Sequence, residues 1–185
     1  MSIRPAVRED LPRMLEIYTP YVENTTYSFE YDPPTLTEFT RRFEAITRQF
    51  PWLVWEEQGA VLGYAYGSAP FQRAAYGWCA EATVYLCPQA HRRGVGSKLY
   101  RVLEDILRMQ GYRKLYALVT SENTGSLAFH KAVGYRHLAE FSDCGEKFGR
   151  LCSVSWLEKD LNRPEDTPRR PVSFLEIRPK TDHLF

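Results

Sequence analysis

Residues 82–99 place a strand-like run, a basic glycine-containing loop and the start of a helix in direct succession. The loop, residues 91–96, reads His-Arg-Arg-Gly-Val-Gly. A loop of this kind at a helix start directs several backbone N–H groups toward one point, where the helix dipole adds positive charge. Glycines allow close backbone approach, and Arg92 and Arg93 supply charged donors, as can Lys98. The segment therefore predicts a pyrophosphate-binding cradle between a sheet and a helix.

The same loop disfavours other phosphate-binding motifs. It has no Gly-Lys-Ser/Thr sequence, as a Walker loop requires, and it lacks the third glycine of the dinucleotide fingerprint. It also lies late in the chain, whereas that fingerprint is expected near the start of a βαβ unit. A plain helix entry with exposed arginines is the alternative to a cradle.

Composition indicates one soluble domain without a strong charge bias. The 185 residues are 44% hydrophobic and 25% charged, which is typical of a globular domain. Because 24 basic and 23 acidic side chains leave a net charge of +1, neither a nucleic acid nor a membrane is an expected partner. No apolar run approaches the roughly 18 residues of a membrane span, and no signal peptide precedes the domain, so a cytoplasmic location is expected.

The cysteines indicate reduced thiols rather than a metal or redox centre. Cys79, Cys87, Cys144 and Cys152 contain no Cys-x-x-Cys pair, so no metal is expected. Without a signal peptide, free thiols are favoured over the disulfides that an even count permits.

Hydrophobic periodicity predicts alternating strands and helices through the first half of the chain. Apolar residues at helical spacing indicate two early helices, the second capped by Thr35 or Thr37. Two β-rich runs joined by Gln-Gly-Ala indicate an antiparallel hairpin. The expected elements are strand 2–6, helix 10–22, loop 23–34, helix 35–50, strands 52–57 and 61–68, loop 70–76 and strand 77–86.

The second half continues the alternation and ends in a segment of different composition. The expected elements are a helix to residue 110, strand 114–120, helix 123–133 and strands 135–141 and 151–158, with a turn at residues 143–146. From Asn162, the prolines Pro164, Pro168, Pro171 and Pro179 occur among many charges, so residues 1–161 are assigned to the domain and 162–185 to a tail. Within the tail, residues 172–177 are a candidate edge strand.

The cradle resembles the Gln/Arg-x-x-Gly-x-Gly/Ala motif of the GNAT superfamily of N-acetyltransferases, with His91 in the first position. Further motifs are similar to its phosphinothricin and methionine sulfone/sulfoximine acetyltransferase branch. They are Glu-Ala-Thr-Val-Tyr-Leu-x-Pro at 81–88, Arg-x-x-Tyr at 73–76, the helix at 122–135 and Lys-Phe-Gly-Arg at 147–150. The resemblance covers about residues 2–160, nearly the whole domain.

The resemblance implies an α/β (α+β) fold with a central, mostly antiparallel sheet that is flanked by helices and splays to admit acetyl-CoA. Backbone groups of Val84, Tyr85 and Leu86 would pair with the pantetheine arm as a missing strand would. Asn123 and Ser126 would face the pantetheine and the thioester, although Asn123 is equally suited to cap its helix. The pyrophosphate would be held by Arg92, Arg93, Gly94, Val95, Gly96 and Ser97.

The resemblance also implies two catalytic residues. Glu81 matches the proposed general base, and because an ordinary glutamate pKa is about 4.3, it needs burial or a water relay to deprotonate an amine. An ion pair with Arg73 is the structural alternative. His130 takes the helix position of the general acid that protonates the departing thiolate, although a histidine there can also be a packed side chain. A backbone N–H of the 84–86 strand is the expected donor to the polarised carbonyl.

The acceptor implied by the branch is a small amino-acid-like amine. Arg73 would bind its carboxylate or phosphinate, and Phe29, Tyr76 and Tyr85 would form pocket walls. The branch commonly continues Lys-x-Gly-x-Trp-x-Asp, whereas this chain has Leu151 and Ser153 in the last two positions, which weakens phosphinothricin itself as the substrate.

The expected function is therefore acetyl-CoA-dependent N-acetylation of a small amine in a ternary complex, by a protein that forms a homodimer. Two alternatives stay open at this point. A protein or peptide N-acetyltransferase needs an open groove, whereas Arg73 and Tyr76 suggest a small charged ligand. A non-catalytic acyl-CoA sensor would tolerate the loss of Glu81 and His130, and both are present.

Overall fold

The computed structural model describes residues 1–162 and 169–185, so Pro164 and Pro168 of the expected tail lie outside the described residues. A seven-stranded sheet has the order β1-β2-β3-β4-β5-β7-β6, and all neighbouring strands are antiparallel except β4 and β5. Its strands are β1 (Ser2–Pro5), β2 (Trp52–Glu57), β3 (Ala60–Ser68), β4 (Cys79–Leu86), β5 (Lys114–Thr120), β6 (Arg136–Lys147) and β7 (Arg150–Asp160). The mixed α/β sheet predicted from the sequence is confirmed.

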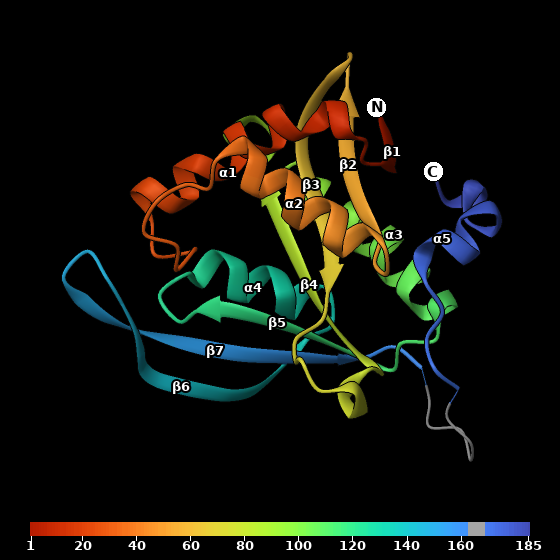
Figure 1. The fold of residues 1–185 in the computed structure, drawn as a ribbon. Coiled ribbons are helices and arrows are strands. Elements are labelled where there is room, and N and C mark those ends of the chain that lie inside the picture. Colours follow the sequence, from red (N-terminus) through yellow and green to blue (C-terminus); the bar gives the residue numbers. More distant parts are fainter. Residues whose placement is uncertain (163–168) are drawn as a thin grey trace.

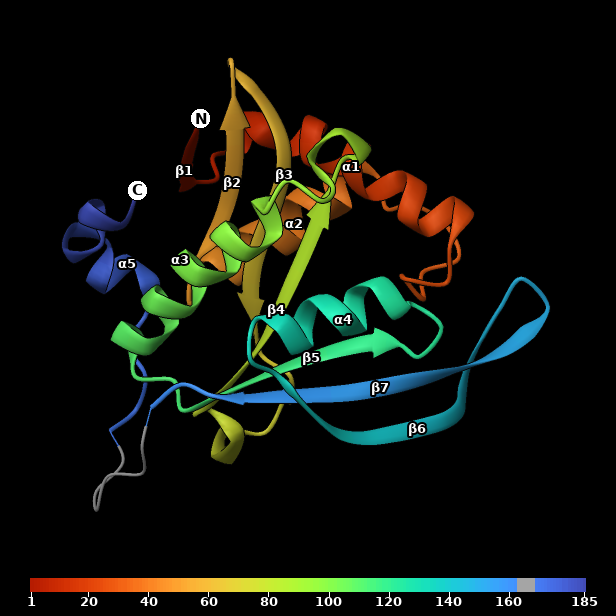
Figure 2. The same ribbon diagram turned by 180° about the vertical axis from the view of Figure 1, so that it is seen from behind.

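Helices cover both faces of the sheet. The helices α1 (Leu11–Asn24) and α2 (Leu36–Thr47) lie on one face, and α3 (Val95–Gln110) and α4 (Thr124–Ala132) lie on the other (Figures 1 and 2). The Thr35 side chain caps α2 by accepting from the Glu38 N–H at 3.2 Å. On α3, Leu99, Leu103 and Ile106 are fully buried against the sheet. Each such burial contributes about 2 kcal/mol, so this amphipathic face anchors the helix.

The sheet opens between β4 and β5. Register partners join the two strands only from Cys79–Lys114 to Glu81–Tyr116, whereas β4 pairs with β3 as far as Leu86. Beyond Glu81 the strands diverge, as both ribbon views show (Figures 1 and 2). The far half of β4 therefore lacks a strand partner on the β5 side, which confirms the splayed sheet.

The predicted turn at Asp143–Glu146 is wrong. This segment belongs to β6, where the pairing with β7 shifts register between Phe141 and Gly145. The chain reverses instead at Phe148 and Gly149, whose φ angles of 55° and 73° suit a two-residue hairpin turn. The polar, glycine-containing sequence that suggested a turn marks a β-bulge.

The predicted edge strand at Val172–Ile177 is also wrong. Ser173 and Glu176 form a capping box that starts the short helix α5 (Phe174–Ile177), and Phe174 and Ile177 are buried. The Gln110 side-chain amide donates to the carbonyl of Val172 at 2.8 Å. The described part of the C-terminal segment therefore packs onto the domain at the end of α3.

Within the described ranges, no helix has the length and apolar character needed to cross a membrane. All four cysteines lie in these ranges and are free, as predicted.

Candidate active site

The N-terminus of α3 presents unpaired backbone N–H groups. Gly94 precedes the helix with a left-handed φ of 75° and has no side chain that could cap it. The first helical N–H with a backbone acceptor is that of Lys98, at 3.1 Å from the Gly94 oxygen. In the described structure, the N–H groups of Val95, Gly96 and Ser97 have no hydrogen-bond partner. This is the local geometry of an anion site.

The basic side chains of the cradle differ in availability. Arg93 binds both carboxylate oxygens of Glu57 at 2.9 Å, so its guanidinium faces the β2–β3 hairpin. The Lys98 ammonium lies 5.1 Å from the ring centre of Trp55. Arg92 is exposed and forms no hydrogen bond or ion pair within the described ranges. Of the two predicted arginine side chains, Arg92 is therefore the one without a partner in the described structure, whereas Arg93 is held by Glu57.

The open edge of β4 is formed by alternate residues. The N–H of Cys87 donates to Leu62 of β3, so by the two-residue period of a strand the backbone groups of Tyr85 also point toward β3. Those of Val84 and Leu86 point toward the opening. The expectation that Tyr85 offers backbone groups to a ligand is therefore wrong, and Val84 is the best placed, because the Leu86 carbonyl already accepts from Tyr21 Oη at 2.6 Å.

Asn123 and Ser126 lie on the other side of this opening. The Oδ1 atom of Asn123 accepts from the Ser126 N–H at 3.0 Å, so Asn123 is the N-cap of α4. Both residues line a cavity in the opening together with Val84, Tyr85 and His130. The cap leaves the Nδ2 group of Asn123 without a partner in the described structure, so the residue can serve both predicted roles.

The Glu81 carboxylate points to the face of the sheet covered by α1 and α2. Tyr85 lies on the same face of β4 and packs against Tyr18 of α1, with ring centres 4.8 Å apart. Glu81 is half-buried, and no ion pair or hydrogen bond to its side chain is present within the described ranges, so the alternative pair with Arg73 does not form. Burial raises the pKa of the Glu81 carboxyl above its ordinary value.

His130 lies on the opposite face of the sheet and is only 3% exposed. Its Nδ1 is 2.8 Å from the carbonyl oxygen of Ser126, and its Nε2 is 3.0 Å from Tyr100 Oη. Burial lowers the pKa of this imidazole, and the hydrogen bond to Ser126 opposes that shift. Burial therefore favours the neutral ring, whereas the sequence alone suggested a histidine that can be protonated near neutral pH.

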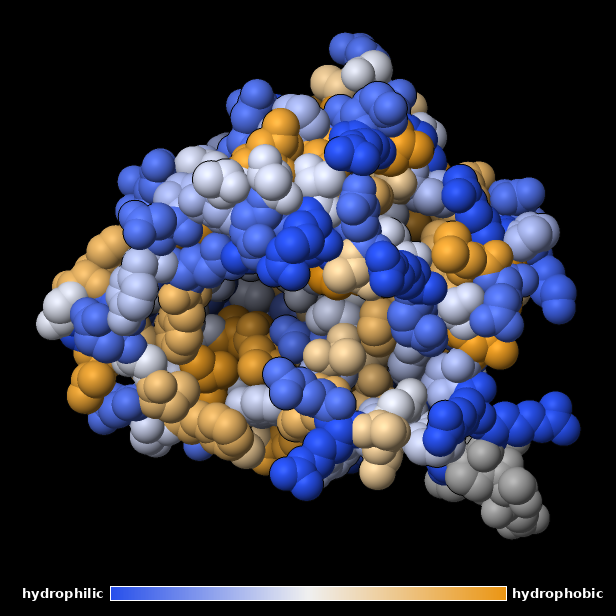
Figure 3. Space-filling model, in the orientation of Figure 1, coloured by the Kyte–Doolittle hydropathy of each residue, from blue (hydrophilic) through white to orange (hydrophobic). Residues whose placement is uncertain are grey.

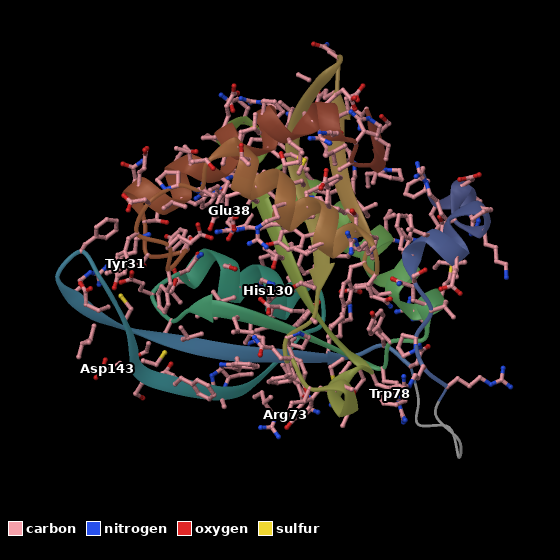
Figure 4. All side chains as sticks on the ribbon, in the orientation of Figure 1. Tyr31, Glu38, Arg73, Trp78, His130 and Asp143 are labelled. Atoms are coloured by element: carbon pink, nitrogen blue, oxygen red, sulfur yellow. The ribbon has the colours of Figure 1, made fainter. Side chains whose placement is uncertain are left out.

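The predicted acceptor residues do not line one pocket. Arg73 and Tyr76 lie on the β3–β4 connection and share a surface pocket with Phe71 and Trp78, whereas Tyr85 lines the cavity of the opening. Phe29 rests its ring on Gly145 of β6. Figure 4 shows Arg73 below the sheet and His130 near the centre of the molecule.

A hollow with a hydrophobic floor lies between the α1–α2 layer and the β6–β7 edge (Figure 3). On this face of the sheet, the Phe141 ring packs 5.3 Å from that of Trp156, whose register partner on β5 is the exposed Leu118. Tyr116, the partner of Glu81 across β4 and β5, shares the same face. The hydrophobic floor of the hollow and the Glu81 side chain therefore lie on the same face of the sheet.

Comparison with known proteins identifies the family to which this chain belongs. The acetyltransferase (GNAT) domain matches residues 3–156. The chain belongs to the GNAT acetyltransferase family. It is 34% identical over 172 residues to phosphinothricin N-acetyltransferase of Streptomyces viridochromogenes, covering 93% of each protein. It is 33% identical to the L-methionine sulfoximine/L-methionine sulfone acetyltransferase of Pseudomonas paraeruginosa, covering 90% of this chain and 98% of that one.

A solved GNAT structure supports the same assignment. The phosphinothricin acetyltransferase of Sinorhizobium meliloti, crystallised in complex with AcCoA, superposes with a TM-score of 0.86 at 31% identity. The match covers 94% of this chain and 97% of that one. The resemblance read from the cradle and the strand before it is therefore confirmed.

In this GNAT chain His91 stands where the motif has Gln or Arg. Its Nε2 lies 3.2 Å from both Tyr21 Oη and the Leu86 carbonyl oxygen. The side chain therefore packs back against the end of β4. His91 makes no hydrogen bond with the N–H groups of Val95, Gly96 and Ser97 in the described structure.

The contacts of two further residues were not predicted from the sequence. Tyr100 on α3 contacts His130. The sequence indicated only that a tyrosine lies on the buried face of a helix, where its hydroxyl needs a hydrogen-bond partner. Lys147 is 1% exposed and donates to the carbonyl oxygens of Val22 and Ser28 at 2.6 Å each. Lys147 belongs to the Lys-Phe-Gly-Arg motif at 147–150, but the motif did not predict that its ammonium connects β6 to the end of α1 and to the loop that follows.

Proposed function

We propose that this GNAT enzyme transfers the acetyl group of acetyl-CoA to the primary amine of a small amino-acid-like substrate. The observation that carries the proposal is the opening between β4 and β5. It connects free N–H groups at the start of α3 with the unpaired edge of Val84, and Glu81 lies on the acceptor side. The names of the relatives, which describe acetylation of phosphinothricin and of methionine sulfoximine or sulfone, support the substrate class.

Acetyl-CoA fits the residues present. The N–H groups of Val95, Gly96 and Ser97 would bind the pyrophosphate with the Arg92 guanidinium. Backbone groups of Val84 would hold the pantetheine arm, and the free amide of Asn123 would donate to it from the other side. The thioester supplies the activated acetyl group, and the Val84–Leu86 edge supplies N–H groups for the developing oxyanion.

Glu81 is the proposed general base. Its raised pKa makes the carboxylate a stronger base than an exposed glutamate, and the absence of an ion pair in the described structure leaves both oxygens available. A water between Glu81 and the amine would relay the proton. The neutral amine then attacks the thioester directly, in a ternary complex.

Arg73 and Tyr76 remain proposals for recognition of the acceptor's acidic group. Arg73 makes no ion pair within the described ranges, so its guanidinium is available to a carboxylate or phosphinate. Arg73 and Tyr76 line a pocket of their own, and we place this pocket at the rim of the acceptor hollow. Phe29 would contact the acceptor from the β6 side.

A homodimer is proposed for the assembled enzyme. The β6–β7 edge exposes large apolar side chains, and most residues of β6 are exposed. An apolar sheet edge of this kind is typical of a surface that another chain covers. The exposed residues are Leu138, Phe141, Phe148 and Leu151.

The test is release of free thiol from acetyl-CoA by the purified protein with a panel of amines. The panel contains methionine sulfone, methionine sulfoximine, phosphinothricin, ordinary amino acids, polyamines, aminoglycosides and short peptides. Turnover confined to small amines with an acidic group is the expected result, and Arg73→Gln should then raise KM for the amine more than it lowers kcat.

Turnover with peptides alone would overturn the substrate class and favour the peptide N-acetyltransferase alternative. Binding of acetyl-CoA, measured by calorimetry, without turnover of any amine would favour the acyl-CoA sensor.

A further inference from the structure

Both ring nitrogens of His130 are occupied within the protein. Nδ1 faces the Ser126 carbonyl oxygen at 2.8 Å, with Ser126 Oγ at 3.3 Å. A carbonyl oxygen accepts but cannot donate, so Nδ1 carries the hydrogen and Nε2 is the nitrogen that titrates. Nε2 in turn faces Tyr100 Oη at 3.0 Å. Neither nitrogen is left to contact the sulfur of a bound thioester.

The Tyr100 hydroxyl lies between His130 and the opening. Its oxygen is 3.0 Å from Nε2 and also 3.0 Å from the Ala82 carbonyl oxygen. Ala82 is two residues before Val84, so its carbonyl points to the same open side of β4. Tyr100, Ala82 and His130 line the same cavity. Of the pair, the Tyr100 hydroxyl is therefore the group that contacts the open edge of β4.

The two acceptors around Tyr100 define two hydrogen-bonding states. With neutral His130, the one O–H must choose between Nε2 and the Ala82 carbonyl, and donation to Nε2 leaves that carbonyl without this donor. With a protonated ring, Nε2–H donates to Tyr100 Oη, and the O–H donates to Ala82. The arrangement thus accommodates both protonation states of His130 without movement of a ring.

We propose that Tyr100 is the immediate proton donor to the departing CoA sulfur and that His130 supplies Tyr100 with its proton. The inference rests on the proposed acetyl transfer. When the carbon–sulfur bond breaks, its electron pair stays on sulfur, and the Tyr100 O–H proton forms the new S–H bond. The proton on Nε2 of the protonated ring moves to the Tyr100 oxygen and leaves neutral imidazole, the form that burial favours; before the next turnover the ring takes up a proton from solvent, into which the proton taken from the amine has been released.

The surroundings of the pair favour a coupled transfer. Burial raises the pKa of Tyr100 well above its ordinary value and lowers that of His130, so neither a lasting tyrosinate nor a lasting imidazolium is favoured. The other ionisable groups around the pair are Tyr135, whose ring centre is 5.2 Å from that of His130, the Tyr66 hydroxyl, and the carboxyls of Glu104 and Glu81. Lys159 binds Glu104 at 2.5 Å and partly neutralises it.

The experiment compares Tyr100→Phe, His130→Ala and the double variant in saturating acetyl-CoA and amine. Because a positioned general acid contributes about 100-fold or more, each single variant should lower kcat by about that factor. Members of one relay act as a unit, so the double variant should be no slower than the slower single variant. The dissociation constant for acetyl-CoA should stay within a few-fold in all three.

Tyr135→Phe is the matched control. Its hydroxyl is buried without a hydrogen-bond partner in the described structure, and its ring packs against the same histidine. Removing this hydroxyl should leave kcat near the wild-type value. Near wild-type kcat in Tyr100→Phe, or multiplicative losses in the double variant, would overturn the relay.

Nitrogen NMR of His130 in the wild-type protein gives a readout that does not depend on any variant. Above the pKa of the ring, the expected neutral tautomer carries hydrogen on Nδ1, and hydrogen on Nε2 instead would overturn the relay. If the wild-type protein acetylates no amine, the proposed function fails first. If it does and Tyr100→Phe is unimpaired, the function stands and the relay fails.

Discussion

At the residue scale, Glu81 combines burial with the lack of a charged partner among the described residues. An unpaired carboxylate in a low-dielectric site costs stability, because its charged form is poorly solvated. Burial raises the pKa of Glu81 in the folded state above that of the unfolded chain. The cost is therefore absent below the unfolded pKa and fully present above the folded one.

Glu81→Gln should separate activity from stability. We expect turnover to fall by about 100-fold or more with the loss of the base, while Tm at pH 7 to 8 rises by roughly 2–4 °C for each kcal/mol recovered. The gain in Tm should shrink as pH falls through the raised pKa toward 4.5, the ordinary value. Thermal melts of both proteins across this range check it, and a lower Tm for the variant at neutral pH would contradict the assignment.

Asn123 allows its two roles to be separated by one matched pair of variants. Asn123→Asp keeps an oxygen that accepts from the Ser126 N–H, and Asn123→Ala removes it. The alanine variant should lose about 1 kcal/mol of unfolding free energy, whereas the aspartate variant should not. Both should bind acetyl-CoA more weakly, because both lose the amide donor. Unchanged affinity in Asn123→Asp would limit Asn123 to helix capping.

At the scale of elements, β6 holds the loop after α1 against the acceptor hollow. Lys147 donates to the carbonyl oxygen of Ser28 in this loop and to that of Val22 in the last turn of α1, and the Phe29 ring packs onto Gly145. An added Cβ at Gly145 would lie 2.4 Å from the Phe29 ring, so one of them would have to move. The Phe29 ring can therefore pack onto β6 because Gly145 has no side chain.

Gly145→Ala should lower unfolding stability by about 1–3 kcal/mol, as overpacking does, and should raise KM for the amine by displacing Phe29. In a Phe29→Ala background the same substitution should cost much less, because the ring is gone. Denaturant unfolding of the four proteins measures the coupling. Equal costs in both backgrounds would show that the contact does not constrain the loop.

Features that depend on neighbouring residues could be predicted from the sequence, and contacts between distant residues could not. The helices α2 and α3, a cap at Thr35 or Thr37 and the glycine-containing loop before α3 follow from nearby residues and were predicted, and Thr35 is the cap that forms. The bulge in β6 was taken for a turn because its composition is turn-like, and only pairing with β7 shows otherwise. The contact of Tyr100 with His130 joins residues thirty positions apart, so it required the packed fold.

At the scale of the whole molecule, the C-terminal segment closes the core instead of extending from it. Phe174 is 4% exposed and its N–H donates to the Gln49 carbonyl at 2.9 Å. Phe174→Ala should therefore lower unfolding stability by about 3 kcal/mol or more. Leu175→Ala, beside it and exposed, is the control and should change stability little. Equal, small effects in denaturant melts would show that the segment does not contribute to the core.

If the β6–β7 edge forms the proposed dimer interface, charged substitutions on this edge should dissociate the dimer. Leu138 and Leu151 are 49% and 61% exposed, so Leu138→Glu and Leu151→Glu should fold normally while placing carboxylates in the interface. Burial of an unpaired charge is costly, so the double variant should sediment as a 21.5 kDa monomer at concentrations where the wild type is a dimer. Leu175→Glu, equally exposed on α5, should leave the dimer intact. A wild type that sediments as a monomer, or a dimer that survives both charges, would place any assembly elsewhere on the molecule.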